Sequence, residues 1–393
     1  MKLETFQYYD NAKNKGKKTG WSVEKFPDLD SENTLVLIFS SPDFINHPEP
    51  IMELIRHYPK SRIMGCSSAG EISGSHISDG SVSVAIAKFE KTPIQIASIK
   101  IDSSDASFNA GKQIASMLNK DDLRGIFILS DGLKINGSEL VKGLNTLNKN
   151  DVVITGGLAG DGSNFKQTWT ICNGEIISDA IVAVGFYGDH IQLGHGSRGG
   201  WDIFGPERRI TRSKNNILYE LDGKPALSLY KEYLGEKASG LPATGLLFPL
   251  AIRKDASDNN QLVRTILAVD EKEASLIFAG DMPMGYLAQL MRANFDRLIE
   301  GATEAGKLTV TKHNGLNDKS PLLLIAISCV GRRLLLGERI EEETESVLEI
   351  FPSNAQQVGF YSYGELSPYT EGKCDLHNQT MTLTSITEET EEV

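Results

Sequence analysis

Two short segments of the chain share a residue spacing that could bring a serine and a carboxylate together in one sharp turn. Residues 65–72 read GCSSAGEI and residues 359–366 read GFYSYGEL, so both follow the pattern Gly-x-x-Ser-x-Gly-Glu-hydrophobic. Each segment follows a strand-like run, and glycine permits the sharp backbone turn that the end of a strand requires. Serine hydroxyls and glutamate carboxylates in such turns could bind a small polar ligand. We interpret the two segments as a structural duplication whose turns meet at one pocket.

Neither turn matches the pattern of a hydrolase nucleophile, which requires glycine two residues before and two residues after the serine. Cys66 stands two residues before Ser68, and Phe360 stands two residues before Ser362, so each turn lacks the first glycine. No spacing places a histidine beside either serine, and one sequence cannot define a catalytic triad. We therefore predict a binding protein that is not an enzyme, and a hydrolase-type enzyme is the weaker alternative.

A glycine-rich segment follows another strand-like run. Residues 156–162 read GGLAGDG and come directly after Val152, Val153 and Ile154. In α/β folds ligands bind at this end of a strand, where free backbone N–H groups can cradle an anion. The glycine spacing matches neither the dinucleotide-binding pattern nor the lysine-bearing phosphate loop, so we do not expect a nucleotide. Asp161 could pair with a ligand ammonium, or it could cap the turn.

An arginine pair follows the strand that we expect at residues 321–329. The guanidinium of Arg332 at the end of this strand would suit a ligand carboxylate, and the alternative is an ion pair with an acid of the helix that follows. The ligand-binding residues predicted from all these motifs are Ser67, Ser68, Glu71, Gly157, Asp161, Arg332, Ser362 and Glu365.

Histidines and cysteines show no metal-binding spacing. His195 lies in the sequence LGHG and His377 in LHNQT, and either imidazole could ligate a haem iron or form a hydrogen bond at a strand edge. The four cysteines lie far apart without a CxxC pair, and no histidines form an HxxxH pair, which argues against zinc and against a disulfide framework. We therefore predict reduced thiols, no metal site and no cofactor, with haem as the alternative.

The length and composition indicate a folded globular chain. The 393 residues are 40% hydrophobic and 23% charged, close to the average for soluble domains, and suffice for two to three domains. Because 40 basic residues stand against 52 acidic ones, the net charge is −12, which disfavours the phosphate backbone of nucleic acids. The polar start and the absence of an apolar run of about 20 residues predict a cytoplasmic protein without membrane insertion.

Strand-like and helical segments alternate along the chain, which predicts a mixed α/β fold. A short helix is expected to start at Asn136, and a longer one at Asp281 with an apolar stripe from Leu287 to Ile299. After the strand at residues 321–329 we expect a helix whose acidic residues, between Glu338 and Glu349, face the solvent. The predicted architecture is two modules, each with a mixed β-sheet flanked by helices.

Several blocks of sequence, taken together, resemble the FIST domain family. The blocks are residues 65–72, 156–162, 219–226 (YELDGKPA), 329–333 (CVGRR) and 360–365 (FYSYGE). Their order is similar to that of a FIST N-terminal module followed by a FIST C-terminal module. The resemblance implies an N-terminal segment at residues 1–29, a FIST N-terminal module at 30–222, a FIST C-terminal module at 223–370, and a closing strand with an acidic tail at 371–393.

The resemblance also implies a function. It implies that this chain is similar to a sensory module of signal transduction that binds small ligands such as amino acids. We therefore expect a small ligand in a cleft between the two modules. Because few residues remain for an output domain, we expect the signal to pass to a separate protein, such as a histidine kinase.

One branch of the family senses nitric oxide through haem and acts on a histidine kinase. This chain is similar to that branch at Cys329–Arg333 and at Leu376–Thr380. This similarity implies His377 and His195 as haem ligands in the alternative function. The chain departs from that branch because Ser328 stands in place of an aspartate and His377 adjoins the following asparagine directly. Along a strand, such a shift by one residue turns a side chain to the opposite face.

Overall fold

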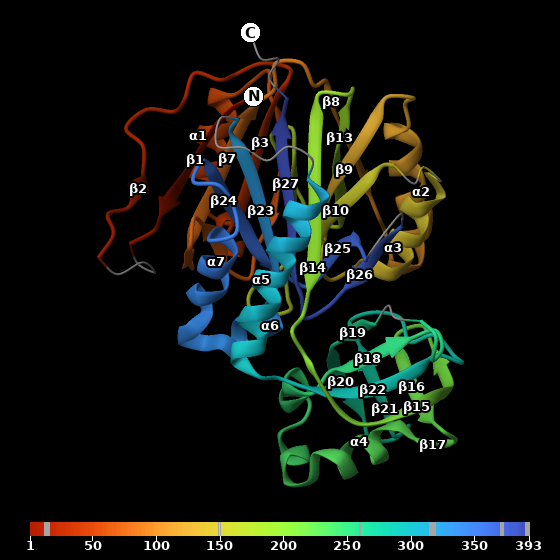
Figure 1. The fold of residues 1–393 in the computed structure, drawn as a ribbon. Coiled ribbons are helices and arrows are strands. Elements are labelled where there is room, and N and C mark those ends of the chain that lie inside the picture. Colours follow the sequence, from red (N-terminus) through yellow and green to blue (C-terminus); the bar gives the residue numbers. More distant parts are fainter. Residues whose placement is uncertain are drawn as a thin grey trace.

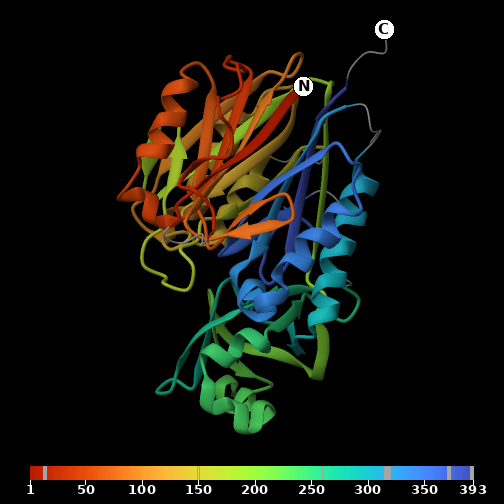
Figure 2. The same cartoon turned by 90° about the vertical axis from the view of Figure 1, so that its left-hand side faces the viewer.

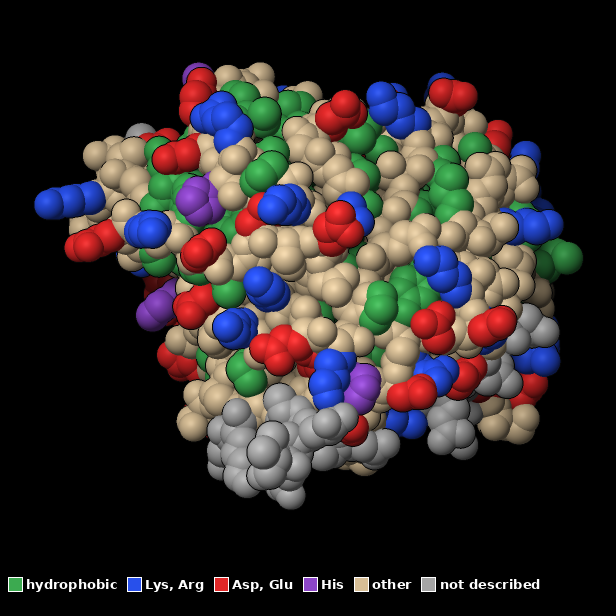
Figure 3. Space-filling model, turned by 90° about the horizontal axis from the view of Figure 1, so that it is seen from above, with side chains coloured by type: hydrophobic (Ala, Val, Ile, Leu, Met, Phe, Trp, Pro, Cys, Tyr) green, Lys and Arg blue, Asp and Glu red, His purple; other side chains and the backbone are tan. Residues whose placement is uncertain are grey.

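The computed structural model describes residues 1–11, 16–147, 149, 151–258, 261–313, 320–369 and 373–389. It consists of a larger body and a smaller domain formed by residues 202–292, which we call the small domain (Figures 1 and 2). In Figure 1 the small domain lies below the body, and both termini lie at the opposite end. On the face seen from above, Figure 3 shows Lys and Arg side chains interspersed with Asp and Glu side chains.

Three mixed sheets form the body, and all three have the same strand order. The orders are β12-β11-β4-β3-β7-β1-β2, β26-β25-β10-β9-β13-β8 and β6-β5-β24-β23-β27-β14. The first sheet contains β1 (Lys2–Tyr9), β2 (Gly20–Trp21), β3 (Thr34–Ser40), β4 (Arg62–Ser67), β7 (Ser81–Lys88), β11 (Thr170–Cys172) and β12 (Glu175–Ile177). The second contains β8 (Ile94–Lys100), β9 (Leu123–Ser130), β10 (Val153–Leu158), β13 (Ala180–Tyr187), β25 (Gly364–Pro368) and β26 (Cys374–His377). The third contains β5 (Glu71–Ser73), β6 (His76–Ser78), β14 (Ile191–Arg198), β23 (Leu322–Cys329), β24 (Ala355–Ser362) and β27 (Met381–Glu388).

Each of these sheets is built around one pair of parallel strands. The pairs are β3 with β4, β9 with β10, and β23 with β24. Within each pair the chain crosses from the first strand to the second through helices, which are α1 (Glu49–His57), α3 (Gly137–Leu144), and α6 (Val330–Leu336) with α7 (Ile340–Leu348). An antiparallel strand, β7, β13 or β27, lies on the other side of the first strand. The body therefore contains three equivalent repeats, and the two Gly-x-x-Ser-x-Gly-Glu turns belong to the first and the third.

The chain leaves its own sheet after the second strand of every parallel pair. After β4 it enters the third sheet as β5, which pairs with β24. After β10 it enters the first sheet as β11, which pairs with β4, and after β24 it enters the second sheet as β25, which pairs with β10. This exchange is cyclic, so none of the three sheets is complete without the other two.

The apolar inner faces of the three sheets pack against one another at the centre of the body. Phe39, Leu129 and Ile327, one from each first strand, belong to a single buried cluster. The rings of Phe39 and Phe360 stack with their centroids 4.9 Å apart. Helix α1 covers the outer face of the first sheet, α2 (Ser107–Leu118) and α3 cover the second, and α5 (Phe295–Lys312) and α7 cover the third. The centre of the body is thus filled with side chains.

The small domain has an antiparallel sheet and an apolar core of its own. Its strand order is β19-β18-β22-β15-β16-β21-β20, with β17 beside β16. The elements are β15 (Asp202–Lys214), β16 (Ile217–Leu221), β17 (Lys224–Pro225), α4 (Ala226–Leu234), β18 (Leu250–Arg253), β19 (Leu262–Arg264), β20 (Ile266–Asp270), β21 (Ser275–Phe278) and β22 (Leu287–Arg292). Leu227 and Tyr230 of α4 pack against Leu218 and Phe278 of the sheet.

The fold class predicted from the sequence, mixed α/β with mixed sheets flanked by helices, is confirmed. The helix expected at Asn136 is also confirmed, because the Asn136 side chain caps α3 by accepting the N–H of Glu139 at 3.1 Å. Side-chain oxygens at this position satisfy one of the N–H groups that the first helical turn leaves unpaired.

The longer helix predicted from Asp281 is wrong in its first part. Residues Leu287–Arg292 form β22, which lies between β18 and β15 in the sheet of the small domain. Helix α5 begins only after Asn294, whose side chain accepts the N–H groups of Asp296 and Arg297 at 3.1 and 3.3 Å. A short apolar run fits the helical and the strand period equally well, and here the neighbouring strands decide.

Two predictions about acidic residues are also wrong. Glu343, expected on a solvent-facing surface, is fully buried and pairs with Arg332 at 3.0 Å. Glu388, expected in a frayed tail, is buried and accepts the backbone N–H groups of residues 90–92 at 2.7 to 2.8 Å. Residues 390–393 of the predicted tail lie outside the described residues.

A glycine occupies the same register position in the second strand of every parallel pair. The pairs are Gly65 opposite Ile38, Gly156 opposite Ile128, and Gly359 opposite Ala326. A Cβ atom added at these glycines would lie 2.2, 1.8 and 1.8 Å from the carbonyl oxygen of the opposite residue. Any larger side chain would therefore push the paired strands apart.

We expect Gly359→Ala to destabilise the protein by about 3 kcal/mol, because its methyl group would clash with the backbone of Ala326 inside the body. Urea denaturation followed by circular dichroism measures this loss. Gly306→Ala is the control, because Gly306 lies inside α5, where alanine favours the helix and the nearest atoms, on Ile350, are 3.3 Å or more away. Equal stability of Gly359→Ala and the wild type would contradict the close approach of β23 and β24.

Candidate functional site

A closed ring of backbone hydrogen bonds joins the three places where the chain crosses between sheets. The N–H of Ala69 donates to the carbonyl oxygen of Tyr361 at 2.8 Å, and the N–H of Tyr363 donates to that of Leu158 at 3.1 Å. The N–H of Gly160 closes the ring by donating to the carbonyl oxygen of Ser67 at 3.1 Å. Each donor lies four residues after the glycine of its own repeat, and each acceptor lies two residues after the glycine of another repeat. We call this arrangement the turn ring. It fixes the three crossings relative to one another.

Buried carboxylates reinforce two of the three crossings. Glu71 accepts a short hydrogen bond from the Ser68 hydroxyl, and its other oxygen accepts the N–H and the hydroxyl of Ser81 at 3.1 and 2.9 Å. Glu365 has the equivalent partners: the Ser362 hydroxyl at 2.6 Å, and the N–H and hydroxyl of Thr380 at 3.3 and 3.0 Å. The exposed fractions of Glu71 and Glu365 are 1% and 0%. Both carboxyl groups are thus held within their own turns.

The second repeat lacks this carboxylate network. Strand register and backbone hydrogen bonds define the equivalent positions. Ala159 takes the place of the serines Ser68 and Ser362, and Thr170 takes the place of the glutamates Glu71 and Glu365. Ala180 takes the place of Ser81 and Thr380. All three network positions are therefore changed together. In this repeat residues 161–169 separate the crossing from β11.

Asp161 organises that intervening segment. Its carboxylate accepts the backbone N–H groups of Phe165, Lys166 and Gln167 at 2.8 to 2.9 Å, and the Tyr363 hydroxyl donates a short hydrogen bond to it. Phe165 has a left-handed backbone with φ of 52°, and its ring stacks on Tyr363 with the centroids 4.6 Å apart. Such a conformation is strained in a residue other than glycine and often marks a functional segment. In this structure Asp161 caps the segment.

Arg332 is enclosed by protein groups. It forms a buried ion pair with Glu343 and donates to the backbone oxygens of Leu298 at 2.7 Å and of Gln379 at 3.4 Å. The Glu343 carboxylate also accepts the hydroxyl of Ser328 at 2.5 Å. Because removal of one partner of a buried pair costs about 3–5 kcal/mol, this cluster stabilises the junction of α6 and α7 with β23.

The structure distributes the predicted ligand-binding residues among several buried positions. Ser67 accepts the Trp169 N–H at 3.1 Å, and Gly157 faces the side chain of Ile327 in the core. Glu71 and Glu365 lie in separate crossings, and stacked Phe39 and Phe360 belong to the apolar cluster at the centre. These residues hold the repeats together, and the structure does not bring them to one common pocket.

The structure places the two histidines differently: His377 is engaged within the protein, whereas the Nδ1 atom of His195 is buried without a partner among the described residues. His377 is 3% exposed, its Nε2 atom lies 2.9 Å from the carbonyl oxygen of Ser367, and its ring stacks on Tyr369. Burial lowers the pKa of both His377 and His195 to about 4, so both imidazoles are neutral. With its Nε2 atom engaged and its ring shielded from solvent, His377 offers no position for a haem iron.

A cleft of about 640 Å³ lies between the body and the small domain. We call it the interdomain cleft. The body lines it with the ends of the parallel strands in the second and third repeats, around Gly132, Leu158 and residues 329–331. The small domain lines it around Thr265 and residues 278–280. Ligands of α/β proteins bind at such carboxyl ends of parallel strands.

The walls of the interdomain cleft combine apolar and polar side chains. Leu133, Phe165 and Leu267, which are 38%, 49% and 45% exposed, all line it, together with Tyr363. Among the described residues that line the cleft, the charged ones are Asp105 and Glu139. Glu139 is paired with Lys142 at 2.6 Å, so Asp105 is the lining carboxylate that would attract an ammonium group.

Buried polar atoms without partners lie in and beside the interdomain cleft. Within the described part of the chain, the hydroxyl of Thr265 and both amide atoms of Asn378 and Gln379 are buried without a hydrogen-bond partner. Thr265 lines the cleft, and the Gln379 amide lies against Gly331, which also lines it. An unpaired buried polar group costs about 1–3 kcal/mol, so native proteins rarely keep one without a reason.

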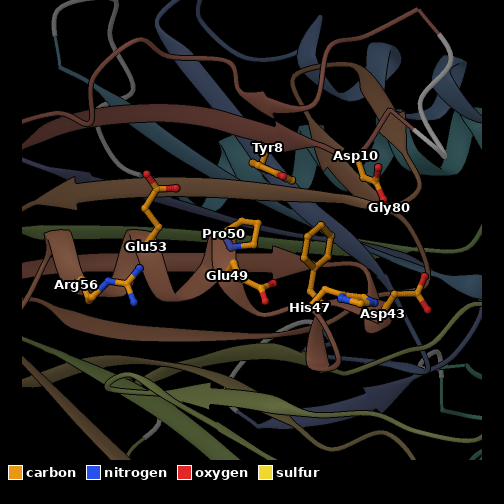
Figure 4. Close-up of a pocket in the computed structure, with 10 residues that line it drawn as sticks. Tyr8, Asp10, Asp43, His47, Glu49, Pro50, Glu53, Arg56 and Gly80 are labelled. Atoms are coloured by element: carbon orange, nitrogen blue, oxygen red, sulfur yellow. The ribbon is translucent and has the colours of Figure 1, made fainter.

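A second cavity of about 530 Å³ lies on the first repeat, between β1 and α1 (Figure 4). Tyr8 and Phe44 form an edge-to-face pair in its wall, and four carboxylates surround it. The Trp21 indole N–H donates to Glu53 at 3.0 Å, and Asp10 and Asp43 have interaction partners within the protein. Because three of its four carboxylates have partners within the protein, we favour the interdomain cleft as the functional site.

The described residues contain neither a cluster of metal-binding side chains nor a helix suited to crossing a membrane. No group of three or more His, Cys, Asp or Glu side chains is placed so that it could hold a metal ion. Within the same residues, no helix combines the length and apolar character that crossing a membrane requires.

Sequence reasoning missed the cleft because its walls come from segments far apart in the chain. Leu133, Phe165 and Leu267 belong to no motif, and their exposure cannot be read from residue type. In the run from His377 to Thr380 the sequence indicates the histidine as a candidate ligand. In the structure the side-chain amides of Asn378 and Gln379, which follow it, are the groups that are buried without a partner among the described residues.

The three interlocked repeats and the inserted small domain form a mixed α/β protein. The chain belongs to the FIST family: residues 34–224 match the FIST N domain, and residues 226–368 match the FIST C domain. FIST domains are associated with sensing in signal transduction.

Two further comparisons identify more distant similarities. An uncharacterized protein of Methanocaldococcus jannaschii is 27% identical over an alignment of 339 residues, and this match covers 79% of this chain and 61% of that protein. The chain thus corresponds to about three fifths of this relative. The crystal structure of a cyanuric acid hydrolase from A. caulinodans matches 76% of this chain and 100% of its own, with 11% identity and a TM-score of 0.18. At this TM-score the match carries no argument about fold or activity.

The buried glutamates predict a specific pH dependence of stability. Burial raises the pKa of Glu71 to about 7 and that of Glu365 to about 8, so the folded protein favours their protonated forms. Because the pKa of an unfolded glutamate is about 4.3, their stabilising contribution is complete below about pH 4 and is lost as the pH rises through about 7 to 8.

We therefore expect the wild type to lose at least about 1 kcal/mol more unfolding free energy than the Glu71→Gln/Glu365→Gln double variant between about pH 5 and pH 9. Urea denaturation at both pH values measures the difference. Other titrating groups are common to the two proteins and cancel in the comparison. Parallel losses in both proteins would show that these carboxyl groups do not titrate in this range.

Proposed function

We propose that this chain is a sensory protein that binds a small amino-acid-like ligand in the interdomain cleft and signals to a separate protein. The observation that carries the proposal is the cleft itself, because it lies at the carboxyl ends of parallel strands and is lined by both the body and the small domain. The membership in the FIST family supports a sensory role.

The chemistry of the cleft supports a ligand with an apolar part and a polar head. Leu133, Phe165 and Leu267 offer an apolar surface that a hydrocarbon or aromatic side chain would cover. The carboxylate of Asp105 would attract an ammonium group, and the unpaired Thr265 hydroxyl offers a hydrogen bond. An apolar amino acid combines these features, so we propose this class of ligand.

Contacts next to the cleft support a route for the signal. The Asp281 carboxylate of the small domain accepts from the amide of Asn136 at 3.2 Å and pairs with Lys142 at 3.1 Å. The backbone N–H of Asp281 donates to the hydroxyl oxygen of Ser138 at 3.2 Å. The buried guanidinium of Arg264 donates to the oxygen of Leu376 in the body at 3.0 Å. A ligand that contacts both bodies would favour one arrangement of these contacts over others.

The recipient of the signal is proposed to be a separate signalling protein, such as a histidine kinase. Sensory domains act on a partner by presenting a different surface in the bound and the free state. The small domain is the part of the molecule that we propose to move, because it connects to the body through the segments before β15 and after β22.

We expect apolar amino acids such as L-phenylalanine and L-leucine to raise the melting temperature by about 3 °C or more at concentrations well above their dissociation constants. Differential scanning fluorimetry with the twenty standard amino acids measures this shift. Leu267→Asp should abolish it by removing apolar surface from the cleft, because Leu267 is already 45% exposed and its replacement costs little stability.

Met284→Asp is the matched control, because Met284 is 69% exposed in the same domain and is not among the residues that line the cleft. This variant should keep the full shift. If none of the amino acids stabilises the wild type, or if Leu267→Asp keeps the shift, the proposed function is contradicted.

A further inference from the structure

The turn between β26 and β27 combines a rigid backbone with unsatisfied side chains. Asn378 and Gln379 are 1% and 0% exposed, and within the described residues neither atom of either side-chain amide has a hydrogen-bond partner. These amides could donate through two nitrogen atoms and accept at two oxygen atoms. The site therefore offers both kinds of hydrogen bond at adjacent positions.

The backbone of the turn is held from several sides. Gln379 has a left-handed conformation with φ of 61°, which is uncommon outside glycine and asparagine. Its carbonyl oxygen accepts the indole N–H of Trp201 at 2.8 Å and a guanidinium N–H of Arg332 at 3.4 Å. The following residue, Thr380, accepts the N–H of Cys329 at 3.1 Å. The surroundings thus enforce a strained backbone and leave the amides unused.

A single glycine separates the Gln379 amide from the interdomain cleft. A Cβ atom added at Gly331 would lie 2.6 Å from Nε2 and 2.7 Å from Oε1 of Gln379. Gly331 also lines the cleft, as do Cys329 and Val330. The Asn378 amide lies beside Gly364, which directly follows the cleft residue Tyr363. Because Gly331 has no side chain, the Gln379 amide packs directly against its backbone.

We propose that Asn378 and Gln379, which are buried beside the interdomain cleft, turn toward it and recognise the head group of its ligand, and that this head group both donates and accepts hydrogen bonds. The inference rests on the proposed function. A purely anionic head would satisfy only the amide nitrogens, and a purely cationic head only the oxygens. The α-amino-acid head satisfies both, because its carboxylate accepts from Nδ2 and Nε2 while its ammonium donates to Oδ1 and Oε1.

A matched set of three probes tests the head group with the wild-type protein. L-Phenylalanine carries both charged groups, 3-phenylpropanoate lacks the ammonium, and 2-phenylethylamine lacks the carboxylate. Isothermal titration calorimetry should show L-phenylalanine binding at least about tenfold more tightly than either analogue. Equal affinity of one analogue and L-phenylalanine would overturn the inference.

Apolar replacements of similar size test the two residues. Gln379→Met and Asn378→Leu should each weaken L-phenylalanine binding by about tenfold or more, yet leave the melting temperature of the free protein unchanged or higher, because each removes an unpaired buried amide. A residue that served only the fold would show the opposite pattern, with a lower melting temperature and the wild-type affinity. That opposite pattern in both variants would overturn the inference.

Thr384→Val is the matched control. Thr384 is 2% exposed on β27, its hydroxyl also lacks a partner among the described residues, and it is not among the residues that line the cleft. This variant should bind L-phenylalanine like the wild type. The comparison of probes needs no variant, so it decides the question even if a variant fails to fold. If L-phenylalanine does not bind to the wild type at all, the proposed function fails together with this inference. If it binds equally to the wild type and both variants, only this inference fails.

Discussion

The architecture of this protein depends on the turn ring, in which each crossing of the chain is hydrogen-bonded to the next through backbone groups only. Because every sheet receives a hairpin from another repeat, the three sheets can be complete only together. The close approach of the paired strands at Gly65, Gly156 and Gly359 follows from the same geometry. Two crossings carry an additional buried carboxylate, which explains why the same motif occurs in two distant parts of the sequence and why neither copy is free to bind a ligand.

The difference between the repeats locates the candidate site. In the second repeat the three polar network positions hold Ala159, Thr170 and Ala180, and the chain makes a detour through residues 161–169. Phe165 of this detour and Tyr363 of the third repeat stack on each other and line the interdomain cleft. The cleft thus opens beside the crossing that lacks the buried serine–glutamate pair of the other two. The other wall belongs to the small domain, so a ligand bound there would contact both parts of the molecule.

Much of the fold could be predicted from residues whose local role is strong. Asn136 caps α3 as its type suggests, and the apolar run at residues 322–329 is a central buried strand. The two turns revealed a repeat, but the third copy remained hidden because its polar positions hold other residues. The burial of Glu343 depends on Arg332, and the strand at Leu287–Arg292 depends on its neighbours β18 and β15, so long-range contacts determined both. For the same reason the cleft could not be derived, since its walls meet only in the folded chain.

The most direct test of this account is hydrogen exchange followed by mass spectrometry, with and without saturating L-phenylalanine. The account predicts that the ligand slows exchange in the segments that line the interdomain cleft, at residues 132–137, 265–267, 278–280 and 329–331. Exchange at residues 68–81, where the first buried carboxylate lies, should not change. Protection confined to residues 68–81, with none in the segments of the cleft, would contradict it.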